Sequence, residues 1–212
     1  MKTELKIPAG IVALDGILTL PPAAAIIVLF AHGSGSSRHS PRNGFVAREL
    51  NRVGLATLLF DLLTPEEETD DIQTGQYRFD VSLLAERLIQ ATRWLQSREQ
   101  TSHLEIGYFG ASTGGAAALI AAAELPADIG AVVSRGGRPD LAGEALSGVE
   151  APTLLIVGER DDIVLEFNRN AQAKLRCEVK LEIVPGATHL FEEPGALDQV
   201  AQLAGDWFLR QP

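Results

Sequence analysis

The sequence contains a single cysteine, Cys177. One thiol cannot form an intrachain disulfide, and the chain has no cluster of Cys and His residues with the spacing of a metal site. We therefore predict neither a disulfide-stabilised scaffold nor a bound metal. Cys177 itself is interpreted as a small buried apolar residue.

Basic residues and long apolar runs are also scarce. There are 18 Lys and Arg against 28 Asp and Glu, a formal net charge of −10, whereas nucleic-acid binding needs an excess of positive charge. The longest apolar stretch, residues 21–31, falls well short of the ~20 residues of a membrane helix. The N-terminus, MKTELKIPAG, lacks the apolar core of a signal peptide. We expect a soluble cytoplasmic protein that binds neither nucleic acid nor membrane.

The remaining composition is that of an ordinary globular protein. Of 212 residues, 46% are hydrophobic and 22% charged, which excludes a largely disordered chain. No repeat or linker divides the sequence, and we expect one domain over residues 1–212. Its 20 glycines and 11 prolines separate short apolar runs from longer helical patterns. This alternation predicts an α/β fold with a mostly parallel sheet.

The sheet is expected to have about seven or eight strands, with helices on both faces. The predicted strands are residues 2–8, 11–20, 26–30, 55–60, 104–109, 130–133, 153–157 and 179–184. The predicted helices are residues 42–52, 80–97, 113–124, 163–175 and 196–209. Residues 64–78 are polar and acidic and too long for a routine connection. We interpret this segment as either a mobile loop over a site or a solvated excursion.

The sequence Gly110-Ala111-Ser112-Thr113-Gly114 matches the pattern G-x-S-x-G, directly between a predicted strand and a predicted helix. A serine nucleophile must project from a sharp turn with no room for side chains at its flanks, and the two glycines meet that need. The N-terminus of the following helix adds N–H groups and a positive dipole. We predict that Ser112 is a nucleophile; the alternative is a tight structural turn.

A serine hydroxyl needs a general base to react near neutral pH. The available histidines are His32, His39, His103 and His189. His189 follows the carboxyl end of the last predicted strand, where α/β sheets place functional groups. His103 precedes a strand and should lie at the opposite end of the sheet. We predict His189 as the base.

The base in turn needs a carboxylate to orient it. Asp161 and Asp162 both follow the predicted strand 153–157. The spacing G-x-x-D favours Asp161, and Asp162 could serve as the N-cap of the next helix. The chain order Ser112, Asp161, His189 is the one expected for a triad built on a G-x-S-x-G turn.

The glycine- and serine-rich loop at residues 31–37 follows a buried strand, and its backbone can approach a substrate closely. In proteins with a G-x-S-x-G turn, one oxyanion donor is the backbone N–H of the residue after the nucleophile, here Thr113. The other donor comes from the loop after this buried strand, and we assign it to the backbone N–H of Ser34. His32 and Gly33 are placed beside the substrate, and His32 is interpreted as a hydrogen-bond donor that stabilises the loop.

The sequence resembles the α/β-hydrolase superfamily over nearly its whole length. It is most similar to small dienelactone-hydrolase-like proteins that occur alone or fused to phosphoribosyltransferase domains. The segments that carry the resemblance are AHGSGSSRHSPRN, LLFDLLTPEEE, GYFGASTGGAAAL, SRGGRPDLAG, PTLLIVGERDDIV and IVPGATHLFEEPGAL. The resemblance implies an α/β-hydrolase fold, with Ser112 where dienelactone hydrolases proper have a cysteine.

Only residues 134–150 stand where larger relatives carry a cap, so we expect no substantial cap domain and an open site for small substrates. Arg42, Arg78, Arg135 and Arg138 fall on loops near the carboxyl ends of strands. We hypothesise that one or more of them attracts an anionic group of the substrate. The alternative is that they pair with the acidic residues of segment 66–71.

These patterns together predict a serine hydrolase that acts on small carboxylic esters or thioesters without a cofactor. Two alternatives use the same residues. One is an acyltransferase, and the other is a non-catalytic binding or sensing module of the same fold.

Overall fold

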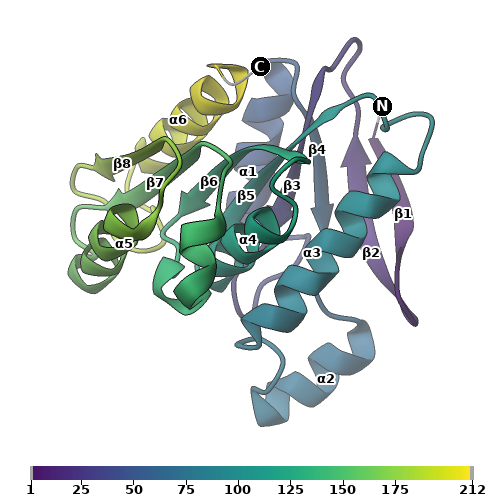
Figure 1. The fold of residues 1–212 in the computed structure, drawn as a ribbon, viewed down its shortest axis with the longest axis horizontal. Coiled ribbons are helices and arrows are strands. Elements are labelled where there is room, and N and C mark those ends of the chain that lie inside the picture. The colour runs from purple at the N-terminus through teal and green to yellow at the C-terminus, as the bar shows by residue number, and fades with distance from the viewer. Residues whose placement is uncertain (1, 211–212) are drawn as a thin grey trace.

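The computed structural model describes residues 2–210 as an eight-stranded sheet between two layers of helices (Figure 1). The strands are β1 (Lys2–Ala9), β2 (Val12–Thr19), β3 (Ile26–Ala31), β4 (Ala56–Phe60), β5 (Glu105–Ala111), β6 (Ile129–Arg135), β7 (Thr153–Gly158) and β8 (Val179–Val184). The helices are α1 (Pro41–Arg52), α2 (Pro65–Thr74), α3 (Val81–Gln96), α4 (Thr113–Glu124), α5 (Asp162–Lys174) and α6 (Ala196–Arg210), with a 3-10 segment, η1 (Pro139–Gly148).

The mostly parallel sheet predicted from the sequence is confirmed. Its strand order is β1-β2-β4-β3-β5-β6-β7-β8. The hairpin β1–β2 is antiparallel and joins β4 in antiparallel register, whereas β4, β3, β5, β6, β7 and β8 pair in parallel. The carboxyl ends of these six strands therefore meet at one edge of the sheet, where ligands bind in open α/β sheets.

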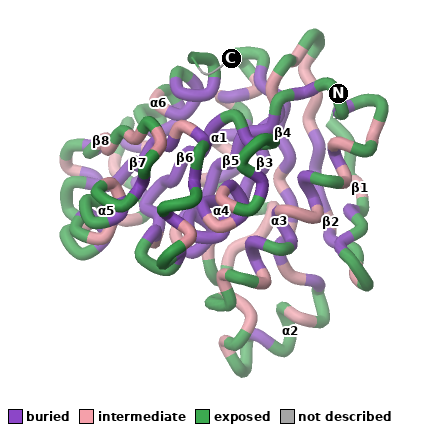
Figure 2. Tube along the Cα trace, viewed as in Figure 1, coloured by how far each residue is buried: buried purple, intermediate pink, exposed green. Residues whose placement is uncertain are grey.

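Helices cover both faces of the sheet, and each face has its own core (Figure 2). In β3, Ile27 and Leu29 pack in the core beneath α3 and α4, while Val28 and Phe30 pack on the opposite side with α1 and α6. All four are at most 1% exposed. A strand buried on both faces reads as an unbroken apolar run, which is why β3 was recognisable in the sequence.

Residues 64–78 contain helix α2, which was not among the predicted helices, and most of this helix is exposed, as the solvated excursion among the two alternatives expected. The Thr64 hydroxyl accepts a hydrogen bond from Glu67 N–H, and the Glu67 carboxylate accepts one from Thr64 N–H. Pro65 occupies the first turn, and Gly75 ends the helix with φ +66°. This is a capping box followed by a left-handed C-cap, so the sequence did carry the signals of a short helix.

Two buried ion pairs hold α2 in place. Arg87 of α3 donates to Glu67 at 2.7 Å, and Arg78 donates to Asp71 at 2.5 Å. Burial of Asp71 opposes its ionisation, but the backbone N–H groups of Arg78 and Tyr77 and the Arg78 guanidinium outweigh burial, so the pKa of Asp71 is lowered. These two ion pairs link α2 to α3 and to the connection between the two helices. Figure 1 shows it apart from the sheet, at the end toward which β4 runs.

Two smaller expectations concern membranes and Cys177. None of the helices between residues 2 and 210 is long and apolar enough to cross a membrane. Cys177 is half-buried against the core, so the interpretation of a fully buried residue is wrong.

Candidate active site

Ser112 lies in the turn between β5 and α4 in a strained backbone conformation. Its φ of 52° and ψ of −122° are unusual for a residue with a side chain. The strain occurs at the point where the strand ends and the helix begins, at the carboxyl edge of the sheet. Such strain is typical of functional turns, where the surrounding structure holds it in place.

The neighbouring glycines are required by close packing of the backbone. A Cβ at Gly110 would lie 2.4 Å from the carbonyl oxygen of Gly114, and one at Gly114 would lie 2.1 Å from that of Ala31. A Cβ at Gly33 would meet Cβ of Ser112 at 3.0 Å. The loop after β3 therefore lies directly against the serine turn, and glycine is the residue that permits this approach.

His189 and Asp161 form a hydrogen-bonded pair at the same edge of the sheet. His189 Nδ1 lies 2.6 Å from Asp161 Oδ2. Asp161 stands just before α5 and its side chain makes no capping hydrogen bond, so its carboxylate is directed to the histidine. Asp162 is exposed in the first turn of α5. The structure thus pairs His189 with Asp161 and leaves Asp162 apart.

Ser112 and His189 line one cleft of about 250 Å³. Its other lining residues are Gly33, Ser34, Ser36, Ser40, Arg42, Asn43, Ala111, Arg135 and Leu190. Within residues 2–210, the Ser112 hydroxyl makes no hydrogen bond to the His189 ring. Catalytic hydrogen bonds are often long or incomplete until substrate is bound.

The two predicted oxyanion donors are connected to each other. The Ser34 backbone N–H donates to the Thr113 hydroxyl at 3.0 Å, and the Thr113 side chain is buried. The Ser34 amide, which was assigned as an oxyanion donor from the sequence, therefore already donates a hydrogen bond in this structure. The hydroxyl fixes the Ser34 amide beside the start of α4, and an anion would have to share or replace this bond.

His32 is a structural residue of the loop after β3. Its Nδ1 lies 3.0 Å from the Gly33 carbonyl oxygen, and its Nε2 accepts a hydrogen bond from Leu62 N–H at 3.0 Å. Burial lowers the pKa of His32 below its ordinary value, partly opposed by the Gly33 carbonyl. These two hydrogen bonds connect the loop after β3 to the loop after β4. Because both ring nitrogens are engaged in them, His32 is not available as a second base.

Arg135, the last residue of β6, brings a buried charge to the cleft. Its side chain is 7% exposed and lies over the Phe191 ring at 5.7 Å. Its Nε and Nη1 atoms have no hydrogen-bond partner within residues 2–210. Burial, with a smaller contribution from the nearby Arg42, lowers the pKa of Arg135 to about 10. Arg42 lies on the rim of the cleft, with Nη1 3.3 Å from Glu192 Oε1.

Arg78 and Arg138, like Arg42, are paired with carboxylates. Arg78 is held by Asp71, as the alternative interpretation expected, and lies outside the cleft that contains Ser112. Arg138 forms two hydrogen bonds to Asp140, at 2.8 and 2.7 Å. Of the four candidates, Arg42 and Arg135 are those that line the cleft.

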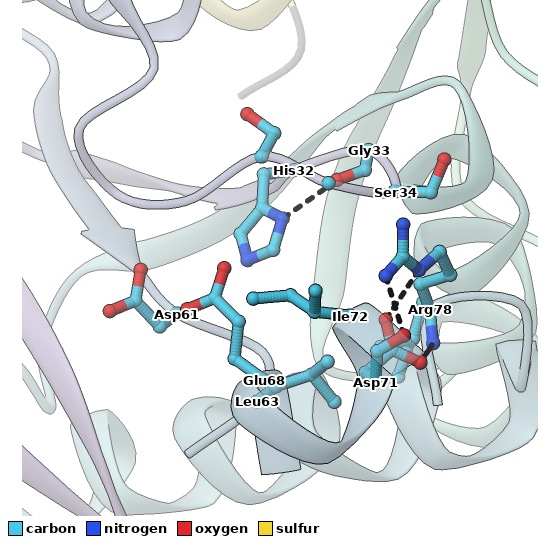
Figure 3. A pocket seen from close by; sticks show the side chains of 12 residues that line it. His32, Gly33, Ser34, Asp61, Leu63, Glu68, Asp71, Ile72 and Arg78 are labelled. Carbon is cyan, nitrogen blue, oxygen red and sulfur yellow. Dashed lines mark hydrogen bonds and ion pairs between the residues drawn. The ribbon is translucent and has the colours of Figure 1, made fainter. Parts of the chain in front are cut away.

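A second cavity of about 240 Å³ lies on the other side of the loop after β3, beneath α2 (Figure 3). His32, Gly33, Ser34, Asp61 and Arg78 are among the residues that line it. This cavity could not be predicted from the sequence, because α2, which forms one of its walls, was not among the predicted helices.

Comparison with known proteins identifies the family. Residues 14–210 match the model of the dienelactone hydrolase family. The chain belongs to the dienelactone hydrolase family. Membership of this family supports hydrolase chemistry.

Two solved structures are similar over nearly the whole chain. A dienelactone hydrolase from Anabaena variabilis is 57% identical, with a TM-score of 0.98 over 100% of this chain and 98% of that one. An α/β serine hydrolase without lid from Xanthomonas campestris is 21% identical, with a TM-score of 0.75 over 99% and 94% of the two chains. The latter comparison shows the fold alone. The eight-stranded sheet and the Anabaena structure confirm the expected α/β-hydrolase fold, and residues 134–150 form the end of β6, the 3-10 segment η1 and a short connection in place of a cap.

The curated relatives are longer proteins. Two sequences from Mycobacterium tuberculosis strains, named as phosphoribosyl transferases, are 59% identical over 206 residues, or 97% of this chain. The match covers 46% of their length, so this dienelactone hydrolase family member spans about half of them.

Proposed function

We propose that this protein is a serine hydrolase that cleaves small carboxylic esters or thioesters through an acyl-enzyme. The observation that carries the proposal is the placement of Ser112, on a strained turn, in one cleft with His189, whose ring is bonded to Asp161. No organic cofactor or metal is included in this proposal. The activity named for the longer relatives is not proposed, because the family model covering residues 14–210 is that of a hydrolase.

In the proposed reaction, Ser112 Oγ attacks the carbonyl carbon and its proton passes to His189 Nε2. The bond between Nδ1 and Asp161 holds the ring in the tautomer that leaves Nε2 free to accept this proton. The Thr113 amide, at the N-terminus of α4, and the Ser34 amide stabilise the oxyanion. His189 then protonates the leaving alcohol or thiol, and water, deprotonated by the same ring, releases the acid.

The test is an assay of nitrophenyl esters of increasing acyl length, with and without an added alcohol as acyl acceptor. A hydrolase releases nitrophenol and free acid, and we expect turnover that falls as the acyl chain lengthens. Formation of the new ester in place of free acid would identify an acyltransferase. An absence of turnover for every ester would contradict the proposal and favour a binding module.

We further propose that Arg135 and Arg42 bind an anionic group of the ester. A buried guanidinium without a hydrogen-bond partner is costly, and such groups are retained mainly where they bind something. The lowered pKa of Arg135 means that its charge destabilises the folded state at any pH below about 10. A carboxylate or phosphate in the cleft would supply the missing acceptors.

Replacement of Arg135 by methionine should therefore increase stability and reduce activity together. We expect the free energy of unfolding to rise by about 1–3 kcal/mol and kcat/KM for an anionic ester to fall about 10- to 100-fold relative to its neutral analogue. Urea denaturation and paired ester assays measure the two effects. Arg138→Met is the matched control, because Arg138 is already paired with Asp140. A less stable Arg135→Met protein with unchanged ester preference would show that Arg135 is structural.

A further inference from the structure

The cavity beneath α2 is adjacent to the active-site cleft. Gly33, Ser34 and Ser36 line both spaces, so the loop after β3 is a shared wall. A substrate group that extends from Ser112 past this loop would reach the cavity. Figure 3 shows the cavity between His32 and the residues of α2.

The walls of this cavity combine apolar surface with one unpaired carboxylate. Leu63, Ile72 and Leu84 provide the apolar surface. Glu68 points from α2 toward the His32 loop (Figure 3), and within residues 2–210 its carboxylate makes no hydrogen bond or ion pair. The two other acidic lining residues are neutralised, Asp61 by Arg38 and Asp71 by Arg78.

The cavity is also preformed. The Arg87–Glu67 pair links α2 to α3, the Arg78–Asp71 pair links α2 to the connection before α3, and the His32 ring holds the opposite wall. A binding site that is fixed before the ligand arrives loses less entropy on binding. Its volume of about 240 Å³ exceeds the 150 Å³ or so that suffices for a benzene ring.

We propose that this cavity is a second subsite, which binds the larger apolar group of the ester, of the size of a substituted aromatic ring. Glu68 accepts a hydrogen bond from a hydroxyl or ammonium group on that ring. The inference rests on the proposed ester hydrolysis and extends it by naming the chemical class of one substrate group. It also assigns α2 a role in specificity.

Ile72→Trp tests the apolar part of the subsite. Ile72 is 74% exposed, so a larger side chain at the mouth of the cavity should not disturb the fold. We expect kcat/KM for a phenyl ester to fall at least about 10-fold, and that for the methyl ester of the same acid to stay within about 2-fold. Ile163→Trp, at a 69% exposed position on α5, is the matched control and should change neither value. Equal loss for both esters, or no loss, would overturn the assignment.

Glu68→Gln tests the polar part. We expect kcat/KM for a 4-hydroxyphenyl ester to fall about 5- to 10-fold, with the 4-methoxyphenyl ester unchanged. Glu66→Gln, on the same helix but outside the cavity, is the control. A loss that does not depend on the ring hydroxyl would contradict the role of Glu68.

A binding measurement separates this inference from the proposed reaction. Saturation-transfer NMR measures binding of 4-hydroxyphenylacetamide to the Ser112→Ala protein. This measurement does not depend on ester cleavage. Binding that disappears in Ser112→Ala/Ile72→Trp and persists in Ser112→Ala/Ile163→Trp would support the subsite even if no ester were hydrolysed. Absence of binding, or binding insensitive to Ile72→Trp, would overturn the subsite even if the enzyme hydrolysed esters.

Discussion

Replacement of Ser112 by alanine is expected to reduce kcat/KM for a short nitrophenyl ester by at least about 10⁴-fold. The alanine removes the atom that forms the acyl-enzyme, while the turn, the neighbouring glycines and the rest of the cleft stay in place. Steady-state assays at matched protein concentration measure the loss, and circular dichroism verifies the fold.

Ser102→Ala is a suitable control for this prediction. Ser102 is exposed in the connection before β5, at the opposite end of that strand from Ser112, and should leave the activity unchanged. If Ser112→Ala retained activity within a few-fold of the parent, Ser112 would not be the nucleophile.

The second large effect is expected at Asp161. Asp161→Asn should reduce kcat by about 10⁴-fold, because an amide next to Nδ1 no longer favours the tautomer in which Nε2 accepts a proton from Ser112. The protein should remain folded, since the change preserves the size of the side chain. Steady-state kinetics over a pH series measure the loss.

Asp162→Asn provides the comparison from the adjacent position. Asp162 is exposed in the first turn of α5, and its replacement should change kcat by less than about 3-fold through a weaker interaction with the helix dipole. If the two variants had equal activities, or if Asp162→Asn were the more damaged, the pairing of Asp161 with His189 would not be the one used in catalysis.

The two cavities differ in charge, and this difference can orient a substrate. Arg135, which has no carboxylate partner within residues 2–210, makes the cleft beside Ser112 positive, whereas Glu68 makes the cavity beneath α2 negative. An ester with an anionic group at one end and a ring bearing a hydrogen-bond donor at the other would bind in one direction.

Much of the fold could be predicted because its signals are local. The run Ile26-Ile27-Val28-Leu29-Phe30 indicates a strand buried on both faces, and the structure confirms it as β3. The pattern around Ser112 indicates a strand, a sharp turn and a helix, because glycines are needed where backbones meet. α2 was missed although Thr64, Pro65, Glu67 and Gly75 carry the signals of its ends, because the acidic composition between them resembled a solvated loop.

The properties that depend on tertiary contacts could not be predicted. The sequence placed Arg42, Arg78, Arg135 and Arg138 at the carboxyl edge of the sheet but could not tell which of them finds a carboxylate. The sequence motif also indicated the Ser34 amide as an oxyanion donor. It could not show that this amide already donates a hydrogen bond to the hydroxyl of Thr113, which lies far along the chain. These contacts depend on side-chain positions that neither periodicity nor motif spacing determines, whereas motif spacing and chain order did indicate the pairing of Asp161 with His189.

The most direct test of the account is labelling with a fluorophosphonate, which forms a covalent bond with an activated serine. We predict a single adduct by intact-mass analysis, located at Ser112 by peptide mapping, with little labelling of His189→Ala and none of Ser112→Ala. An unlabelled protein, or an adduct on another residue, would contradict the claim that Ser112 and His189 form the catalytic centre.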